Sequence, residues 1–256
     1  MSAPGPVSPV WHPFTQHGLA PAAPVVARAE GAWLELESGA RMLDAISSWW
    51  VITHGHCHPR IVAAIQGQAA RLDQVIFAGF THAPAEDVAR KLLSIVPPGL
   101  SHVFYSDSGS TAVEVALKMA LGYWKNRGIN RTRIIAMDHA YHGDTVGTMS
   151  AGARGVFNAA YAPLLFDAAR IPFPEPGQER RTLDTLVHHA KGAAALVVEP
   201  LICGAGGMRL YSPEVLRDMA DICTRHGTLF VADEVMTGFG RTGTLFACEQ
   251  AGITPD

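Results

Sequence analysis

Short apolar runs alternate with helical segments from residue 102 onward, and this alternation restricts the possible folds more than any other feature of the sequence. The apolar runs are "HVFYS", "RIIAMD", "ALVVEP" and "TLFVADEV". The spacing of apolar residues predicts helices between them at residues 111–126, about 182–191 and 213–226. The last helix has Ser212 as its cap, Pro213 in its first position and Gly227 after its end. Strands that alternate with helices in this way predict an α/β domain with a mostly parallel sheet covered on both faces.

The first hundred residues have a different pattern. Residues 1–10 are rich in Pro, Ser, Gly and Ala, which predicts a loose tail. The run "AWLELESGARMLDAIS" at residues 32–47 contains two short alternating segments around a Ser-Gly pair, and this predicts a β-hairpin. Helices are predicted after Pro59 and after "THAP", because apolar residues there recur with helical spacing.

Composition excludes several classes of protein. Apolar residues make up 48% of the chain, charged residues 17%, and the net charge is −3. We therefore expect a sizeable core and no basic surface for nucleic acid. The sequence also lacks a signal peptide at its start and an apolar run of bilayer length, so we expect neither secretion nor membrane insertion. The four cysteines are scattered and form no CxxC motif, which is typical of reduced thiols in a cytoplasmic protein.

Polar residues follow each predicted strand at its carboxyl end, where ligands bind in open parallel sheets. The second strand leads into His139–Asp144, the third into Glu199 and a glycine-rich run, and the fourth into Asp233 and Glu234. Tyr141 could stack on a planar cofactor or simply anchor a turn. Glu199 could point into this rim or be solvated before Pro200.

The segment Ser108-Gly109-Ser110 follows the first predicted strand and begins a helix. Free N–H groups at a helix start, two hydroxyl groups and the helix dipole suit a phosphate. Ordinary capping by Ser108 or Ser110 explains the same residues, so both interpretations stay open.

Competing nucleotide, hydrolase and metal motifs are incomplete. The acids of "LFVADEV" fit a Walker B strand, but no lysine lies in a GxxxxGK[ST] loop. The glycine-rich run at 204–209 has Arg209 in place of the third glycine of a dinucleotide fingerprint, and GxSxG is absent. The histidines of "THGHCHP" are more typical of a loop that leads into the next helix than of a metal site. We predict no metal.

Asp233 lies at the end of an apolar strand, and a buried carboxylate is unfavourable unless it faces a cation. A metal, an arginine and a protonated heteroaromatic ring are the candidates. A phosphate loop and an aromatic residue on the same rim favour the third. Pyridoxal 5'-phosphate combines a phosphate, a flat ring and a basic ring nitrogen, and Asp233 would keep that nitrogen protonated.

Several segments together make the chain resemble the class III, fold-type I pyridoxal-phosphate aminotransferases. These are "WHPFTQ", "SSWW", "DSGSTAVEVALKMALGYW", "YHGDTVGTMS", "EPLICGAGGM" and "ADEVMTGFGRTGTLFACE", and the resemblance runs from Trp11 to Asp256. "WHPFT" and "SSWW" narrow it to the adenosylmethionine–8-amino-7-oxononanoate aminotransferases of biotin biosynthesis. The resemblance implies an N-terminal segment of the small domain at residues 1–55 and an incomplete cofactor-binding large domain at 56–256.

The resemblance also implies roles for individual residues. Asp233 and Tyr141 are the expected catalytic residues. The expected cofactor-binding residues are Ser108, Gly109, Ser110, Tyr141, His142, Glu199, Asp233 and Val235. The expected substrate-binding residues are Phe14, Trp49, Tyr141 and Asp144. Arg241 is expected to support the site, together with Asp144 and Glu199.

Two departures from the family pattern affect these expectations. Phe14 replaces the tyrosine of "WHPYT", so the donor substrate loses a hydroxyl contact. The Schiff-base lysine of the family is implied in a segment beyond Asp256, and none of Lys91, Lys118, Lys125 and Lys191 follows a strand of the rim. We therefore expect an N-terminal portion of the enzyme that does not turn over alone.

The resemblance implies S-adenosyl-L-methionine as the donor, 8-amino-7-oxononanoate as the acceptor, a homodimer and a cytoplasmic location. Two alternatives stay open at this point. One is another class III aminotransferase that acts on ornithine, 4-aminobutyrate or a diamine, and the other is a non-catalytic binding module.

Overall fold

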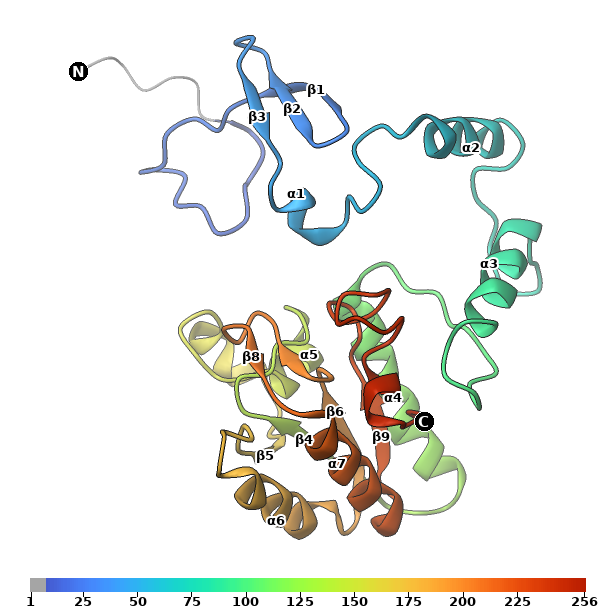
Figure 1. Ribbon diagram of the computed structural model, residues 1–256, viewed down its shortest axis with the longest axis vertical. Helices are drawn as coiled ribbons and strands as arrows, with labels where there is room; N and C mark the ends of the chain where they lie inside the picture. Colours follow the sequence, from blue (N-terminus) through green and yellow to red (C-terminus); the bar gives the residue numbers. More distant parts are fainter. Residues whose placement is uncertain (1–7) are drawn as a thin grey trace. The chain divides into compact units, whose positions relative to one another are not determined.

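The computed structural model describes residues 8–256, which form two compact units with a boundary between Thr81 and His82 (Figure 1). The predicted tail at 1–10 therefore lies mostly outside the described residues. The domain division after residue 55 follows from the family resemblance and stays a prediction. No helix among the described residues is both long and apolar enough to cross a bilayer.

The first unit contains a three-stranded antiparallel sheet in the order β1-β2-β3. Its strands are β1 (Val26–Glu30), β2 (Trp33–Leu36) and β3 (Arg41–Leu43). The predicted hairpin is the β2–β3 pair, in which Trp33 lies opposite Leu43. The turn α1 (Ser47–Trp50) and the helix α2 (Pro59–Ala69) follow.

The second unit is built on a four-stranded parallel sheet in the order β5-β4-β6-β9. Its strands are β4 (Arg133–Met137), β5 (Ala169–Ile171), β6 (Ala193–Val198) and β9 (Leu229–Ala232). The helices α3 (Ala83–Leu93), α4 (Gly109–Asn126), α6 (Glu179–Ala190) and α7 (Pro213–His226) belong to the same unit. The predicted parallel α/β architecture is confirmed.

Helices cover both faces of this sheet because successive side chains of a strand point to opposite faces. On β6, Ala195 and Val197 pack with residues of α4, while Leu196 and Val198 belong to the larger cluster with α6 and α7. The whole of β6 is buried, as expected for a central parallel strand. α7 has the predicted bounds, and Ser212 Oγ accepts a hydrogen bond from the Val215 amide.

The predicted strand at residues 102–106 is wrong. This segment is irregular and pairs with no strand of the described chain, and its Phe104 side chain is exposed. The apolar run resembles a strand, but strand formation also requires a hydrogen-bonding neighbour. Several short elements were not predicted, namely α5 (Val146–Ala151), a 3-10 helix at Ala159–Leu164, the β7 (Ile202–Cys203) and β8 (Arg209–Leu210) pair, and α8 (Cys248–Ala251).

Candidate active site

The carboxyl ends of β4, β6 and β9 lie at one edge of the parallel sheet (Figure 1), which we call the rim. The rim carries the loop 139–145 after β4, Glu199 after β6 and Asp233 after β9. The Asp233 amide donates to the Val198 carbonyl at 2.8 Å, so the strand pairing continues up to the carboxylate. This pairing fixes the backbone position of Asp233.

Asp233 forms a buried pair with His142. Its Oδ2 lies 2.7 Å from His142 Nδ1, and the His142 side chain is fully buried. Asp233 itself is only 8% exposed, and its Oδ1 accepts a hydrogen bond from the Val235 amide at 3.2 Å. The other ring nitrogen of His142, Nε2, is buried and has no partner in the described chain. The sequence led us to expect His142 at the cofactor site, but it did not predict that His142 pairs with Asp233, for which a metal, an arginine or a cofactor ring was the expected partner.

The start of α4 combines a cap with free amides. Ser108 Oγ accepts from the Thr111 amide at 3.1 Å, and Thr111 Oγ1 accepts from the Ser108 amide at 2.8 Å. This capping box engages the Ser108 hydroxyl, so the capping interpretation holds for that residue. The amides of Gly109 and Ser110 open an 18-residue helix and therefore lack intrahelical acceptors.

Contacts join the start of α4 to the rest of the rim. A Cβ on Gly109 would lie 3.2 Å from Val235 Cγ2, so the absence of a side chain lets these two residues touch. Ser110 Oγ accepts from the Asp144 amide at 3.2 Å. The helix start is thus bonded to the loop after β4 and packed against the segment after β9.

Tyr141 is half-exposed on the rim, and both its backbone and its hydroxyl are fixed. The hydroxyl donates to Asp144 Oδ2 at 2.9 Å, while the amide donates to Glu199 Oε1 at 2.8 Å. Partial burial, together with the Asp144 carboxylate, raises the pKa of Tyr141 to about 12. The phenol therefore stays protonated near neutral pH and keeps its bond to Asp144.

Glu199 joins two loops of the rim. It is buried, and its Oε2 accepts from the Gly204 amide at 2.9 Å in addition to the bond with Tyr141. Desolvation raises the pKa of this carboxyl despite the two amide donors. The interpretation of Glu199 as a solvated residue is therefore wrong. It holds the loops after β4 and β6 together.

Glu114 of α4 also binds the loop after β4, and it was not among the residues expected at the site. Its carboxylate accepts hydrogen bonds from Thr145 Oγ1 at 2.7 Å and from the amides of Gly147 and Thr148, both at 3.2 Å. These groups open α5, so a carboxylate is favourable there. The sequence feature that could have identified Glu114 is an acidic residue at a helical position next to the apolar face of α4.

Phe14 and Trp49 belong to the first unit, and the structure brings them together. Their ring centroids lie 6.0 Å apart, and both rings are exposed. Arg241 is an exposed residue of the loop before α8 in the second unit. Lys91 lies on α3, Lys118 and Lys125 lie on α4, and Lys191 follows the end of α6.

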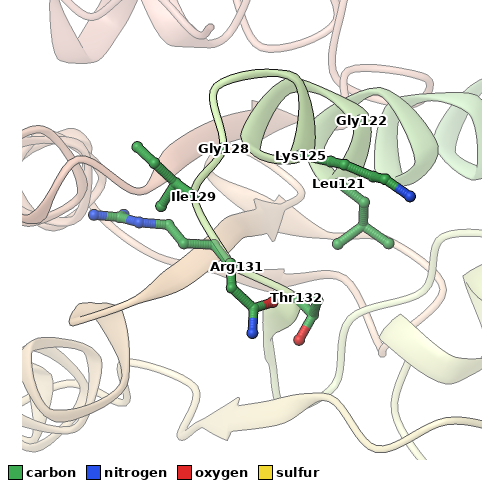
Figure 2. Close-up of a pocket in the computed structure, with 8 residues that line it drawn as sticks. Leu121, Gly122, Lys125, Gly128, Ile129, Arg131 and Thr132 are labelled. Carbon is green, nitrogen blue, oxygen red and sulfur yellow. The ribbon is translucent and has the colours of Figure 1, made fainter.

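A hollow of about 480 Å³ lies at the opposite edge of the sheet, before the amino end of β4 (Figure 2). Arg131 lines it, but its Nη1 donates to the carbonyls of Ala193, His226 and Gly227. Its guanidinium also covers the Trp124 ring at 4.2 Å. The Arg131 guanidinium therefore has a structural role, since it links three segments of the chain. The hollow is separate from the rim.

The histidine-rich segment "THGHCHP" forms a loop and the start of α2, as predicted. His56 Nε2 lies 2.7 Å from Asp44 Oδ2, and His54 lies beside Thr53. Within residues 8–256, no three His, Cys, Asp or Glu side chains are grouped as metal ligands.

Comparison with known proteins identifies the family to which this arrangement belongs. A family model described as "Aminotransferase class-III" matches residues 15–256. The chain belongs to the class III aminotransferases. The fold is that of the fold-type I pyridoxal-phosphate enzymes in this family.

This class III aminotransferase chain is similar to several relatives named adenosylmethionine-8-amino-7-oxononanoate aminotransferase. It is 51% identical to that of Synechococcus elongatus and 44% identical to that of Nitratidesulfovibrio vulgaris, in each case over 96% of the chain. It covers 61% and 49% of these relatives. The chain thus spans about half to three-fifths of their length.

Solved structures of other aminotransferases have the same fold. The protein of that name from Methanocaldococcus jannaschii superposes with a TM-score of 0.89 at 36% identity, covering 94% of this chain and 56% of that one. An amine transaminase from an uncultivated Pseudomonas species, solved in a PLP-bound form, gives a TM-score of 0.88 at 31% identity, covering 97% and 61%.

Proposed function

We propose that this chain supplies the cofactor bed of a pyridoxal-phosphate-dependent aminotransferase of biotin biosynthesis. The observation that carries the proposal is the buried Asp233 carboxylate, held at the end of β9 beside His142. Val235, two residues further on, packs against Gly109 at the start of α4. Membership of the class III aminotransferases and the names of the relatives support the same conclusion.

The residues of the rim fit the chemical groups of this cofactor. The amides of Gly109 and Ser110 and the dipole of α4 suit a phosphate dianion. Asp233 suits a protonated ring nitrogen, because an anion that is shielded from water interacts strongly with a cation. Val235 is 71% exposed and Tyr141 45% exposed, which leaves an apolar and an aromatic surface for a flat ring to cover. We assign these residues, with Ser108, His142 and Glu199 in support, to cofactor binding.

When bound, pyridoxal phosphate supplies an electron sink that stabilises negative charge at the substrate carbon. Asp233 holds a proton on the ring nitrogen and so maintains the sink. His142 fixes the orientation of the Asp233 carboxylate through the 2.7 Å contact. Tyr141, oriented by Asp144 and Glu199, provides a ring surface whose hydroxyl keeps its proton near neutral pH.

We infer that the whole protein transfers an amino group from S-adenosyl-L-methionine to 8-amino-7-oxononanoate. Phe14 and Trp49 would contact substrate, and Arg241 would support the site. A cytoplasmic homodimer is the expected state. Because no lysine of this chain follows a strand at the rim, we expect no steady turnover from residues 1–256 alone. Turnover by this chain, given cofactor and both substrates, would contradict that expectation.

Titration of the 256-residue chain with pyridoxal phosphate tests the proposal. We expect saturable binding, followed by the change in cofactor absorbance, and competition by inorganic phosphate. Asp233→Asn should weaken binding about tenfold or more, equivalent to at least about 1.4 kcal/mol. Asp221→Asn on the exposed side of α7 is the matched control. Absence of binding, or equal affinity of both variants, would contradict the proposal.

An aminotransferase with another amine donor is the second candidate. Its support is that structures named as ω-transaminases, among them one from Thermomicrobium roseum, match the chain with a TM-score of 0.88. Comparing S-adenosyl-L-methionine with ornithine, 4-aminobutyrate and a diamine as donors for the whole protein separates the two. The biotin-pathway proposal requires a clear preference for S-adenosyl-L-methionine.

A further inference from the structure

Four consecutive residues of the first unit have left-handed backbone conformations. The φ angles are 49° at Ser47, 46° at Ser48, 67° at Trp49 and 72° at Trp50. None of these residues is glycine, and L-residues adopt this region only as isolated exceptions. Strain of this kind persists only where surrounding contacts enforce it, and it concentrates at functional sites.

Asp44 supplies the contacts that enforce this turn. Its Oδ1 accepts from the Ser48 amide at 2.9 Å, and its Oδ2 accepts from the Ser48 hydroxyl at 2.8 Å. The Asp44 backbone is fixed as well, since its amide donates to the Ala32 carbonyl at 2.9 Å. One carboxylate at the end of β3 therefore holds two groups of the strained turn.

His56 completes the arrangement. Its Nε2 lies 2.7 Å from Asp44 Oδ2, and the two side chains are only 14% and 5% exposed. The His56 backbone is bonded in both directions to Gly31, at 2.7 Å and 3.1 Å. The histidine-rich loop thus fixes Asp44 against the sheet of the first unit. His56 therefore has a structural role that depends on neither a metal nor a cofactor.

The turn presents an aromatic side chain to the outside. Trp49 is 61% exposed, and its ring is tilted by 60° against that of Phe14. An exposed tryptophan on a strained turn is unfavourable by itself, because relaxation of the backbone would release the strain. The partly buried Asp44–His56 pair prevents that relaxation.

We propose that Asp44 and His56 are positioning residues that hold the left-handed turn and thereby keep Trp49 against Phe14 as a ligand-facing aromatic pair. The part concerning a ligand rests on the proposed function. The part concerning the turn does not, because it depends only on contacts within residues 8–81.

Fluorine NMR of the chain labelled with 5-fluorotryptophan tests the positioning role without cofactor or substrate. The chain has five tryptophans, and Trp49→Phe assigns the resonance of interest. Asp44→Ala should shift and broaden the Trp49 resonance, while that of Trp124, in the core of the second unit, stays in place. Glu37→Ala, which removes an exposed acid of the same hairpin, should change neither.

Three further variants separate positioning from a general effect on folding. Ser47→Gly in the Asp44→Ala background should move the Trp49 resonance part of the way back, since glycine removes the strain at one of the four left-handed positions. His56→Leu should shift the resonance in the same direction, whereas His56→Gln, whose amide nitrogen can take the place of Nε2, should not. These two keep the test valid if Asp44→Ala does not fold.

An unchanged Trp49 resonance in both Asp44→Ala and His56→Leu would overturn the proposal. A change that Ser47→Gly does not reduce at all would overturn it too, because Asp44 would then act on the fold and not on the turn. If the resonances behave as expected but S-adenosyl-L-methionine and pyridoxal phosphate leave Trp49 unaffected, the positioning role stands. The proposed donor contact at Trp49 then fails.

Discussion

Among single residues, Asp233 and His142 form a buried pair on the rim. The His142 ring is buried, and its Nε2 has no hydrogen-bond partner in the described chain. Its only side-chain hydrogen bond among the described residues is the one between Nδ1 and Asp233. The same carboxylate is the proposed partner of the cofactor nitrogen. Asp233 is therefore expected to contribute to stability as well as to cofactor binding.

Removing Asp233 should destabilise the chain even in the absence of cofactor. Asp233→Ala leaves both ring nitrogens of His142 buried and unpartnered, which costs about 1–3 kcal/mol. Urea unfolding of the apo chain measures this loss. Asp221→Ala, at an exposed position, should change stability by less than about 0.5 kcal/mol. Equal stability of the two variants would contradict the pairing.

The Asp44 carboxyl should make stability depend on pH in a defined range. The Ser48 amide, followed by His56 and the Ser48 hydroxyl, lowers its pKa from 3.8 to about 2. A carboxyl group whose pKa is lower in the folded state stabilises the protein fully at pH values above its unfolded pKa. This stabilisation is lost as the pH falls through the folded pKa. The wild type should therefore be more stable than Asp44→Asn at pH 6, and the difference should shrink between about pH 4 and pH 2. A constant difference over that range would contradict this assignment.

At the scale of elements, short helices of the second unit depend on contacts at their ends. α5 has only six residues, so its own hydrogen bonds cannot stabilise it. Glu114 binds its first turn, and Arg170 donates to the carbonyls of Ser150, Ala151 and Gly152 at its end. The opposite charges match the two ends of the helix dipole.

Glu114→Ala should therefore loosen α5 and the loop that carries Tyr141. We expect a loss of about 1–2 kcal/mol, as for a helix cap, and faster hydrogen exchange at the Thr148 amide. Lys118→Ala, an exposed position of the same helix α4, should leave that exchange rate unchanged. Equal protection of Thr148 in both variants would show that Glu114 does not hold α5.

Two glycine substitutions should have opposite signs because their backbone conformations differ. Gly227 ends α7 with φ of 61°, whereas Gly122 lies within α4 with open space around it. Gly227→Ala should destabilise the chain by roughly 1 kcal/mol, since a side chain is strained in the left-handed region. Gly122→Ala should stabilise it by about 0.5–1 kcal/mol. Thermal unfolding checks both, and equal signs would contradict the assigned conformations.

At the scale of the whole molecule, the features set by local patterns were predictable from sequence. α7 has its predicted bounds because its cap, its proline and its final glycine all lie in the sequence near one another. The parallel sheet follows from the alternation of strands and helices. The strand expected at 102–106 failed because pairing depends on a distant neighbour, which an apolar run does not specify.

The candidate site was predictable to a similar extent. The rule on strand ends brought Tyr141, Glu199 and Asp233 to one rim, and the structure places them there. The pairing of Asp233 with His142, 91 residues away, could not be predicted, because no local pattern records which side chains meet across neighbouring strands. For the same reason, the contacts of Glu114 and Asp44 could not be predicted from the sequence.

The proposed function depends above all on Asp233 keeping the ring nitrogen of pyridoxal phosphate protonated. Nitrogen NMR of the 256-residue chain with cofactor labelled at that nitrogen measures the protonation state directly. We predict a protonated nitrogen at neutral pH in the wild type and in Asp221→Asn, and an unprotonated one in Asp233→Asn. The same nitrogen signal in the wild type and in Asp233→Asn would contradict the account.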